Sequence, residues 1–404
     1  SRILEGLDPG YSSDRRVIAG ICKGRELANT FTQIQFARDV LEKACQIMQK
    51  EAFLYQQRAI LEYSHHDGSL ELADNLATKA REYDSHNHIY IHTLAEISIR
   101  KASIEENIVR RDHLRARAKS LLSEIRIRDS RRDASYCKLL VDETLDLSKT
   151  INDNSKEHEI LEFDSKLEET AVRIQKAQQD FPDEPDISSI EARLWRGLGE
   201  SSKTEKSLEK AVLAKPRSPG VYARLARLRR ERGAISEQMS VLRDGLTRFP
   251  DDKALHLQMA LALLENDKSQ SDAIESHFGK SFSTNDQNFD ARFYFAEYLF
   301  WSGRAQEASK LFEDIANRSA TNYRRSSPRE DDLITSLLGN FTGNVTSRKE
   351  RFFFVRIANY PSEVFCYHTT LDDAPYETLA VGSSVSVKLR FNRQGPVGCK
   401  VTIL

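Results

Sequence analysis

Apolar residues recur with a period near 3.6 from Glu26 to Asn322, the spacing that places them on one face of an α-helix. After Gly339 the period changes to two, and short strand-like runs at 352–355, 364–367 and 385–389 are separated by turn residues. The pattern therefore predicts a long helical region followed by a small all-β domain. The fold class we expect is mainly α, with a C-terminal barrel.

Within the helical region, small and turn-forming residues repeat at a fixed interval. Prolines lie 34 residues apart, at Pro182, Pro216 and Pro250. Alanines keep the same interval, at Ala192, Ala226 and Ala260. A fixed period of 20 to 50 residues indicates stacked helical units rather than one globular core. The alternative, a helical domain without repeats, does not account for this interval.

The clearest unit, 289–322, resembles the tetratricopeptide repeat (TPR), a helix–turn–helix. Ala296, Gly303, Ala308 and Phe312 fall where that family has small residues, glycine, alanine and phenylalanine. Small residues are needed where two helix axes cross closely. The resemblance implies a TPR-like α-solenoid whose groove binds a protein. The unit 252–287 departs from the pattern after its alanine, and its second helix is not clear from the sequence.

Residues 102–180 are rich in charged residues and lack the regular 34-residue repeat interval. They predict three long helices near 103–128, 131–150 and 157–180, which are either stretched repeats or an inserted hairpin. The predicted organisation is then a tail of a preceding domain or an extension, N-terminal TPR-like helices, long charged helices, regular TPR units, a linker with a capping helix, and the barrel. These segments are 1–25, 26–101, 102–180, 181–322, 323–339 and 340–404.

The C-terminal segment resembles the cold-shock domain, a five-stranded OB-type barrel. Residues 343–345 resemble its first strand, and 352–355 and 364–368 fall on its two RNA-binding motifs. The resemblance implies binding of single-stranded RNA or DNA, with aromatic rings that stack on bases and basic residues that hold phosphates. The residues that it places in this role are Phe352, Phe354, Phe365, Tyr367, Lys349 and Arg351.

This segment departs from the cold-shock pattern at several positions. Residues 346–348 replace the first-strand tryptophan, Phe353 replaces the glycine between the two motif phenylalanines, and Tyr367 replaces a histidine. The alternative interpretation is that these aromatic residues fill the barrel and cover the end of the solenoid. In that case the barrel binds a protein partner or nothing.

Arginines mark a second candidate site in the regular repeats. In the TPR family, positions just after the small residue of the first helix face the concave groove. The alanines at 192 and 226 place four arginines at such positions: Arg193, Arg196, Arg227 and Arg230. Guanidinium groups bind carboxylates and phosphates through paired hydrogen bonds. The groove is therefore a candidate site for a protein or acidic ligand, and the alternative is a solvated face paired with neighbouring acids.

Net charge and cysteine content limit the possible ligands and the cellular compartment of the protein. The formal net charge is −1, so nucleic-acid binding requires local basic patches. Residues 100–132 are one basic stretch, which we interpret as a solvated helix face. The five cysteines are scattered and odd in number, which predicts a reducing compartment without a zinc site. No run of 18 apolar residues occurs, so we expect a cytoplasmic protein without a membrane span.

The sequence gives little evidence for a metal site or for an enzyme. His88 and His92 have the helical spacing of a metal pair, but no HExxH motif accompanies them, and we expect no metal and no cofactor. The sequence has no phosphate-binding loop and no nucleophile elbow, so an enzyme is not expected within these residues. The order of a turn-rich tail, irregular helical repeats and a barrel resembles the C-terminal part of bacterial STAND-type defence proteins. This resemblance implies an alternative function, the sensor half of a larger STAND-type NTPase in anti-phage defence. A structural scaffold with an inert barrel is another.

Overall fold

The computed structural model describes residues 20, 31–65, 67–152, 155–283, 286, 289–318, 333–372 and 375–404. The predicted segment 1–25, apart from residue 20, and most of the predicted linker after residue 322 lie outside this part of the chain. The chain divides into two compact units, Ser1–Val221 and Tyr222–Leu404.

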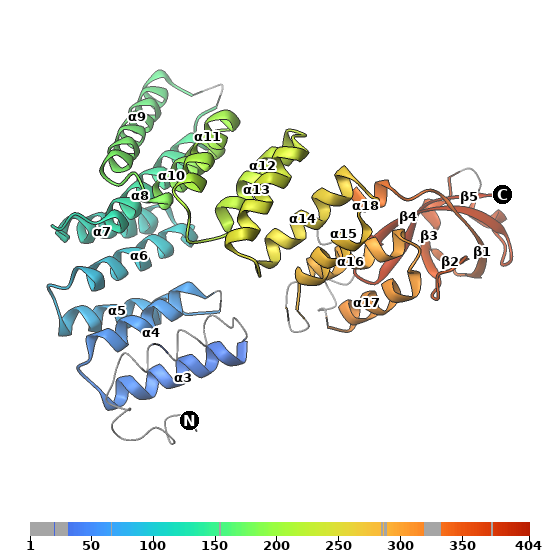
Figure 1. Cartoon of the computed structure of the whole chain (residues 1–404), viewed down its shortest axis with the longest axis horizontal. Helices are drawn as coiled ribbons and strands as arrows, with labels where there is room; N and C mark the ends of the chain where they lie inside the picture. Colours follow the sequence, from blue (N-terminus) through green and yellow to red (C-terminus); the bar gives the residue numbers. More distant parts are fainter. Residues whose placement is uncertain are drawn as a thin grey trace. The chain divides into compact units, whose positions relative to one another are not determined.

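The described helices of the first unit form antiparallel neighbours (Figure 1). Their bounds are α3 Phe31–Ile47, α4 Ala52–Ser64, α5 Leu70–Tyr83, α6 His88–Ile104, α7 Ile108–Glu124, α8 Ser130–Ser148, α9 Glu157–Asp180, α10 Pro185–Gly197 and α11 Ser201–Leu213. Alanines at the helix contacts are fully buried, as at Ala59, Ala73 and Ala95. Their small side chains let the helix axes approach closely.

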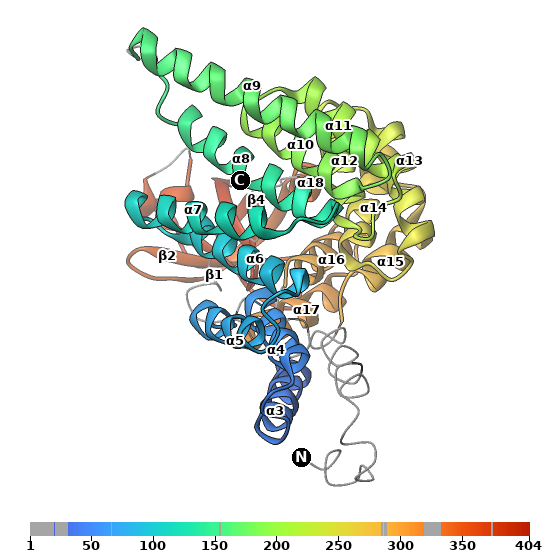
Figure 2. The same cartoon turned by 90° about the vertical axis from the view of Figure 1, so that its left-hand side faces the viewer.

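The long charged helices predicted in 102–180 are α7, α8 and α9. The first is shorter than predicted because α6 extends to Ile104 and Asn107 caps α7, its side chain accepting a hydrogen bond from the Arg110 N–H at 3.1 Å. In α9, the buried residues Thr170, Ile174 and Ala177 all lie in the second half. The first half of α9 projects beyond its neighbours in this unit, as Figure 2 shows.

The second unit contains the remaining helices. α12 Gly220–Glu231 begins at the unit boundary and is followed by α13 Ile235–Arg248, α14 Lys253–Asn266, α15 Ser271–Lys280, α16 Asp290–Trp301, α17 Ala305–Arg318 and α18 Leu333–Ser336. α15 is the second helix of the unit 252–287, which the sequence pattern leaves undefined. Its Ile274 and Phe278 are fully buried and hold it in place.

Glycines end the first helix of three repeat pairs in the same way. Gly199, Gly233 and Gly303 all have a positive φ, between 75° and 87°. In each pair the next residue donates its N–H to the carbonyl five positions earlier, as from Arg304 to Leu299 at 2.8 Å. This is the Schellman arrangement, which needs a left-handed residue that glycine adopts without steric cost.

Five strands form a closed barrel at the C-terminus, in the order β1-β2-β3-β5-β4. Their bounds are β1 Phe341–Arg348, β2 Phe352–Ile357, β3 Val364–Tyr367, β4 Ser384–Asn392 and β5 Gly395–Ile403. β3 and β5 are parallel, whereas the other pairs are antiparallel. Gly343 lies within β1, as the cold-shock resemblance implies, and Gly395 is the first residue of β5. The Cβ of any other residue at 343 would meet the Arg356 carbonyl oxygen at 2.6 Å.

The barrel packs on α16 and α17 and shares their hydrophobic core. Phe300 of α16 contacts the rings of Phe341, Tyr360 and Phe391, with centroids 5.3–5.7 Å apart. Phe312 of α17 stacks on Phe391 at 5.7 Å. The barrel therefore covers the last helical pair of the second unit, beside which it lies in Figure 1.

The predicted fold class, TPR-like helical repeats followed by a small all-β barrel, is confirmed. Among the described residues, no helix combines the length and the apolar character that crossing a bilayer requires.

Candidate functional site

Successive side chains of β2 and β3 point alternately to the inside and the outside of the barrel. Phe353 and Val355 of β2 are fully buried, as are Val364 and Cys366 of β3. Burial raises the pKa of the Cys366 thiol to about 12, as expected inside an apolar core. The intervening side chains point outward, and they are the four aromatic residues predicted to stack on bases, Phe352, Phe354, Phe365 and Tyr367.

These four rings form one continuous cluster, here called the aromatic face. Phe352 pairs with Tyr367 and Phe354 with Phe365 across the β2–β3 ladder. Phe365 contacts the three other rings, with centroids 4.8–5.7 Å apart. Tyr367 is 52% exposed, so the cluster has an edge open to solvent. The structure thus brings these four residues together on adjacent strands.

Other aromatic residues perform the structural roles of the alternative interpretation. Phe353, which replaces the family glycine, fills the barrel. Phe341, Tyr360 and Phe391 cover α16 and α17. The aromatic face takes no part in either packing, so the barrel core does not explain its four rings.

Basic residues lie at one end of the aromatic face. Lys349 and Arg351 are exposed in the turn between β1 and β2, and neither forms an ion pair within the described part of the chain. The turn is held by Tyr376, whose hydroxyl donates a hydrogen bond to the carbonyls of Lys349 at 2.7 Å and Phe352 at 2.9 Å. The guanidinium of Arg348 lies 4.6 Å from the centroid of the Tyr376 ring. The turn therefore holds its basic side chains in place beside the rings of the aromatic face.

Sequence reasoning missed three residues around this face. Tyr376 anchors the basic turn, and Val397 of β5 pairs with Phe365 and extends the outer surface. Arg390 is exposed on β4, two residues after Lys388. The signal for Arg390 was present, because residues two apart on a strand share a face. Tyr376 lies in a 3-10 turn and had no such signal.

The four arginines predicted for the groove divide between the two units. In the first unit, Arg193 forms an ion pair with Asp142 of α8, and Arg196 is exposed. In the second unit, Arg230 donates to Glu265 of α14 at 2.9 Å, and Arg227 is exposed. Arg193 and Arg230 thus already have a carboxylate partner. The shared groove stays a prediction.

The basic stretch 100–132 is largely paired with carboxylates on neighbouring helices. Arg117 binds Asp74 through both terminal nitrogens at 2.9 Å, and Arg115 donates to Asp146 at 2.6 Å. These contacts agree with a helix face bound to its neighbours rather than to a nucleic acid. His92 Nε2 lies 2.9 Å from Ser135 Oγ. The described residues contain no group of three or more His, Cys, Asp or Glu side chains arranged for a metal ion.

Comparison with known proteins finds no matching family profile and no matching curated protein. Solved helical-repeat structures do match at low identity. TTC0263, a thermophilic TPR protein of Thermus thermophilus, is 15% identical, with a TM-score of 0.35, over 61% of this chain and 99% of that chain. The human IFIT1 dimer with m7Gppp-AAAA is 17% identical, with a TM-score of 0.37, over 77% of this chain and 69% of that chain. Likenesses of this degree say nothing about what the chain binds.

Proposed function

We propose that this chain is a ligand-recognition module whose C-terminal barrel binds single-stranded nucleic acid on the aromatic face. The observation that carries the proposal is the cluster of four outward rings on β2 and β3, which the barrel core does not use. Aromatic rings on a strand stack on unpaired bases of any sequence, because every base has a π-face.

The basic turn supplies the second requirement, which is contact with the phosphate backbone. Lys349 and Arg351 have no carboxylate partner in the described part of the chain, so their charge is available to an anion. The segment 341–404 contains eight Lys or Arg and five Asp or Glu, so it is basic although the whole chain is not. We infer that the barrel is of OB type, since its closed order and its parallel β3–β5 pair support that assignment.

The helical repeats have a separate role in this proposal, which is to bind a protein partner. Repeat helices present extended surfaces suited to such binding. The pairing of Arg193 with Asp142 and of Arg230 with Glu265 favours a protein with few acidic groups over a strongly acidic ligand. Pull-down with the four arginines changed to glutamate tests this role independently of the barrel.

The barrel proposal is tested with a Phe352→Ala, Phe354→Ala double variant of the full chain. We expect its affinity for fluorescein-labelled oligo-dT and oligo-rU at low salt to fall at least about 30-fold, since stacking contributes about 1–3 kcal/mol per base. Fluorescence anisotropy measures the affinity. Circular dichroism should be unchanged, because both side chains lie outside the core.

Two matched controls separate stacking from general surface change. Phe354→Tyr retains an aromatic ring and should bind like the wild type. Val381→Ala removes an exposed apolar side chain elsewhere in the barrel and should also have no effect. The proposal fails if the double alanine variant binds both oligonucleotides as tightly as the wild type.

A further inference from the structure

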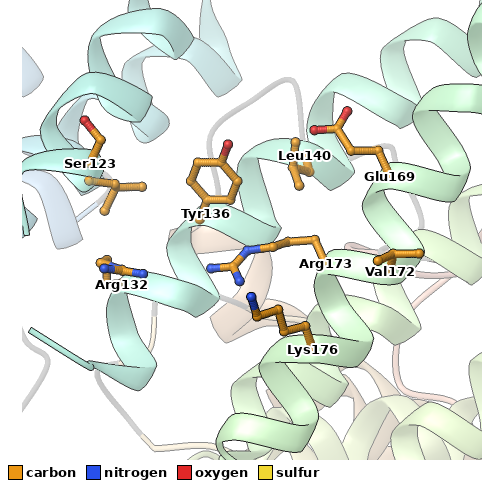
Figure 3. Close-up of a pocket in the computed structure, with 9 residues that line it drawn as sticks. Ser123, Arg132, Tyr136, Leu140, Glu169, Val172, Arg173 and Lys176 are labelled. Atoms are coloured by element: carbon orange, nitrogen blue, oxygen red, sulfur yellow. The ribbon is translucent and has the colours of Figure 1, made fainter. Parts of the chain in front are cut away.

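The first unit contains a pocket of about 620 Å³ between α7, α8 and α9. Figure 3 shows side chains from all three helices around it. The lining residues are Leu122, Ser123, Arg132, Tyr136, Leu140, Glu169, Val172, Arg173 and Lys176. This volume is within the range of small-molecule sites, about 300–1,000 Å³.

Three cationic side chains converge in this pocket. Arg132 extends from the first turn of α8, and Arg173 and Lys176 extend from α9, where a spacing of three residues puts them on one face. In Figure 3 the two guanidiniums and the ammonium group point toward one another. Like charges repel, so three cations directed at one point favour an anion between them.

The carboxylates nearby do not balance this charge. Asp133 is buried, and its Oδ1 accepts hydrogen bonds from Arg132 at 3.0 Å and Arg173 at 2.6 Å, so one carboxylate serves two guanidiniums. Glu169 is held at 2.9 Å by Lys166, which lies outside the lining. Lys176 has no partner in the described part of the chain. About two positive charges therefore remain for a ligand.

The guanidiniums are also held in place before any ligand arrives. Arg132 Nη1 donates to the Ile125 carbonyl at 2.7 Å. The guanidinium carbon of Arg173 lies 5.4 Å from the centroid of the Tyr136 ring. A site whose donors are already fixed loses less conformational entropy on binding. The ion pair with Asp133 thus positions the arginines and leaves some of their N–H groups unused.

The rest of the lining is apolar. Leu122 and Leu140 are almost fully buried, Tyr136 is half-buried, and Val172 is 58% exposed. Apolar walls bind the carbon skeleton of a ligand, whereas a few convergent polar groups fix its orientation. A simple inorganic anion would use the cations and leave these walls uncovered.

We propose that this pocket binds a small organic phosphate with a planar apolar substituent. The dianionic phosphoryl group contacts Arg132, Arg173 and Lys176, and the substituent lies against Tyr136 and Val172. A phosphate monoester carries close to two negative charges at neutral pH, which matches the unbalanced charge of the pocket. The site is independent of the aromatic face of the barrel.

Calorimetric titration of the full chain with adenosine 5′-monophosphate and 1-naphthyl phosphate tests the proposal. We expect both to bind more tightly than inorganic phosphate, and adenosine not to bind. Lys176→Ala should weaken both phosphate esters about 10-fold or more, because it removes an unpaired cation. Val172→Trp should weaken the esters but not inorganic phosphate, because it fills the apolar part of the pocket.

Lys206→Ala is the matched control, since Lys206 is exposed in the same unit and has no partner among the described residues. It should leave every affinity unchanged. Repeating the titration in the Phe352→Ala, Phe354→Ala background excludes binding at the barrel, and the affinities should persist there. Failure of both esters to bind, or equal losses in the two lysine variants, would overturn the proposal.

Discussion

Neighbouring residues of β2 have opposite roles. Phe353 fills the barrel, whereas Phe352 and Phe354 point outward into the aromatic face. Because the side-chain period of a strand is two, a register shift of one residue would exchange these roles. The candidate nucleic-acid site therefore depends on the pairing of Phe354 with Phe365, which sets the register of β2 against β3.

At the scale of single residues, two histidines form a partly buried contact in the second unit. His256 Nε2 donates to the Pro250 carbonyl at 2.8 Å, which leaves its Nδ1 as the acceptor for His277 Nδ1–H at 2.8 Å. Burial, followed by the neighbouring His256 ring, lowers the pKa of His277 to about 4. The His277 ring is therefore neutral at pH 7.

This pair predicts a loss of stability in acid. The unfolded chain binds a proton at His277 near its ordinary pKa of 6.5, whereas the folded chain does so only near 4. The stabilisation is complete above pH 6.5 and is lost as the pH falls toward 4. We expect the melting temperature to fall between pH 7 and pH 5, and to fall less in His277→Gln. An equal fall in both proteins would contradict this origin.

At the scale of elements, the repeat turns depend on left-handed glycines. Gly199 and Gly233 keep the 34-residue interval of the prolines, and Gly303 follows the same geometry. A Cβ at any of the three would meet nothing within 4 Å, so the requirement is one of backbone conformation alone. Helix geometry, rather than side-chain packing, sets these positions.

Gly303→Ala should therefore lower the free energy of unfolding by about 1 kcal/mol, because alanine is strained at positive φ. Urea unfolding followed by circular dichroism measures this change. Gly279→Ala is the matched control, since Gly279 lies in the helix α15 and a Cβ there also meets nothing within 4 Å. That variant should be neutral or stabilising. Similar losses in both variants would rule out the conformational explanation.

At the scale of the whole molecule, the second unit joins two architectures through one core. Phe391 of β4 contacts Phe300 of α16 and Phe312 of α17. Next to these aromatic contacts, Arg393 of the barrel donates a hydrogen bond to Asp290 of α16 at 3.2 Å. The barrel and the last helical pair should consequently unfold together.

Phe391→Ala tests this coupling. Truncating a buried phenylalanine lowers the free energy of unfolding by about 3–5 kcal/mol. Here the lost contacts belong to both the barrel and the helical pair α16–α17. We expect faster hydrogen exchange in α16 and α17 as well as in β4, measured by mass spectrometry. Phe352→Ala, on the outer face, should leave exchange in α16 and α17 unchanged. Faster exchange confined to the strands would show that the barrel folds independently.

The sequence by itself determined the fold class and the inner or outer side of most barrel residues. Both follow from local periodicity, since a period of 3.6 or 2 assigns faces without knowledge of any partner. The aromatic face was predictable for this reason. The left-handed turn glycines carried the same signal as the prolines, through the shared interval of Gly199 and Gly233.

Only the tertiary structure decided which of these groups have partners. Arg132 and Arg173 lie on separate helices and meet at Asp133 because α8 and α9 pack together. Arg193 is likewise paired with Asp142 across two helices. Such contacts depend on how helices cross, which no local period encodes. For that reason the pocket between α7, α8 and α9 could not be predicted from the sequence.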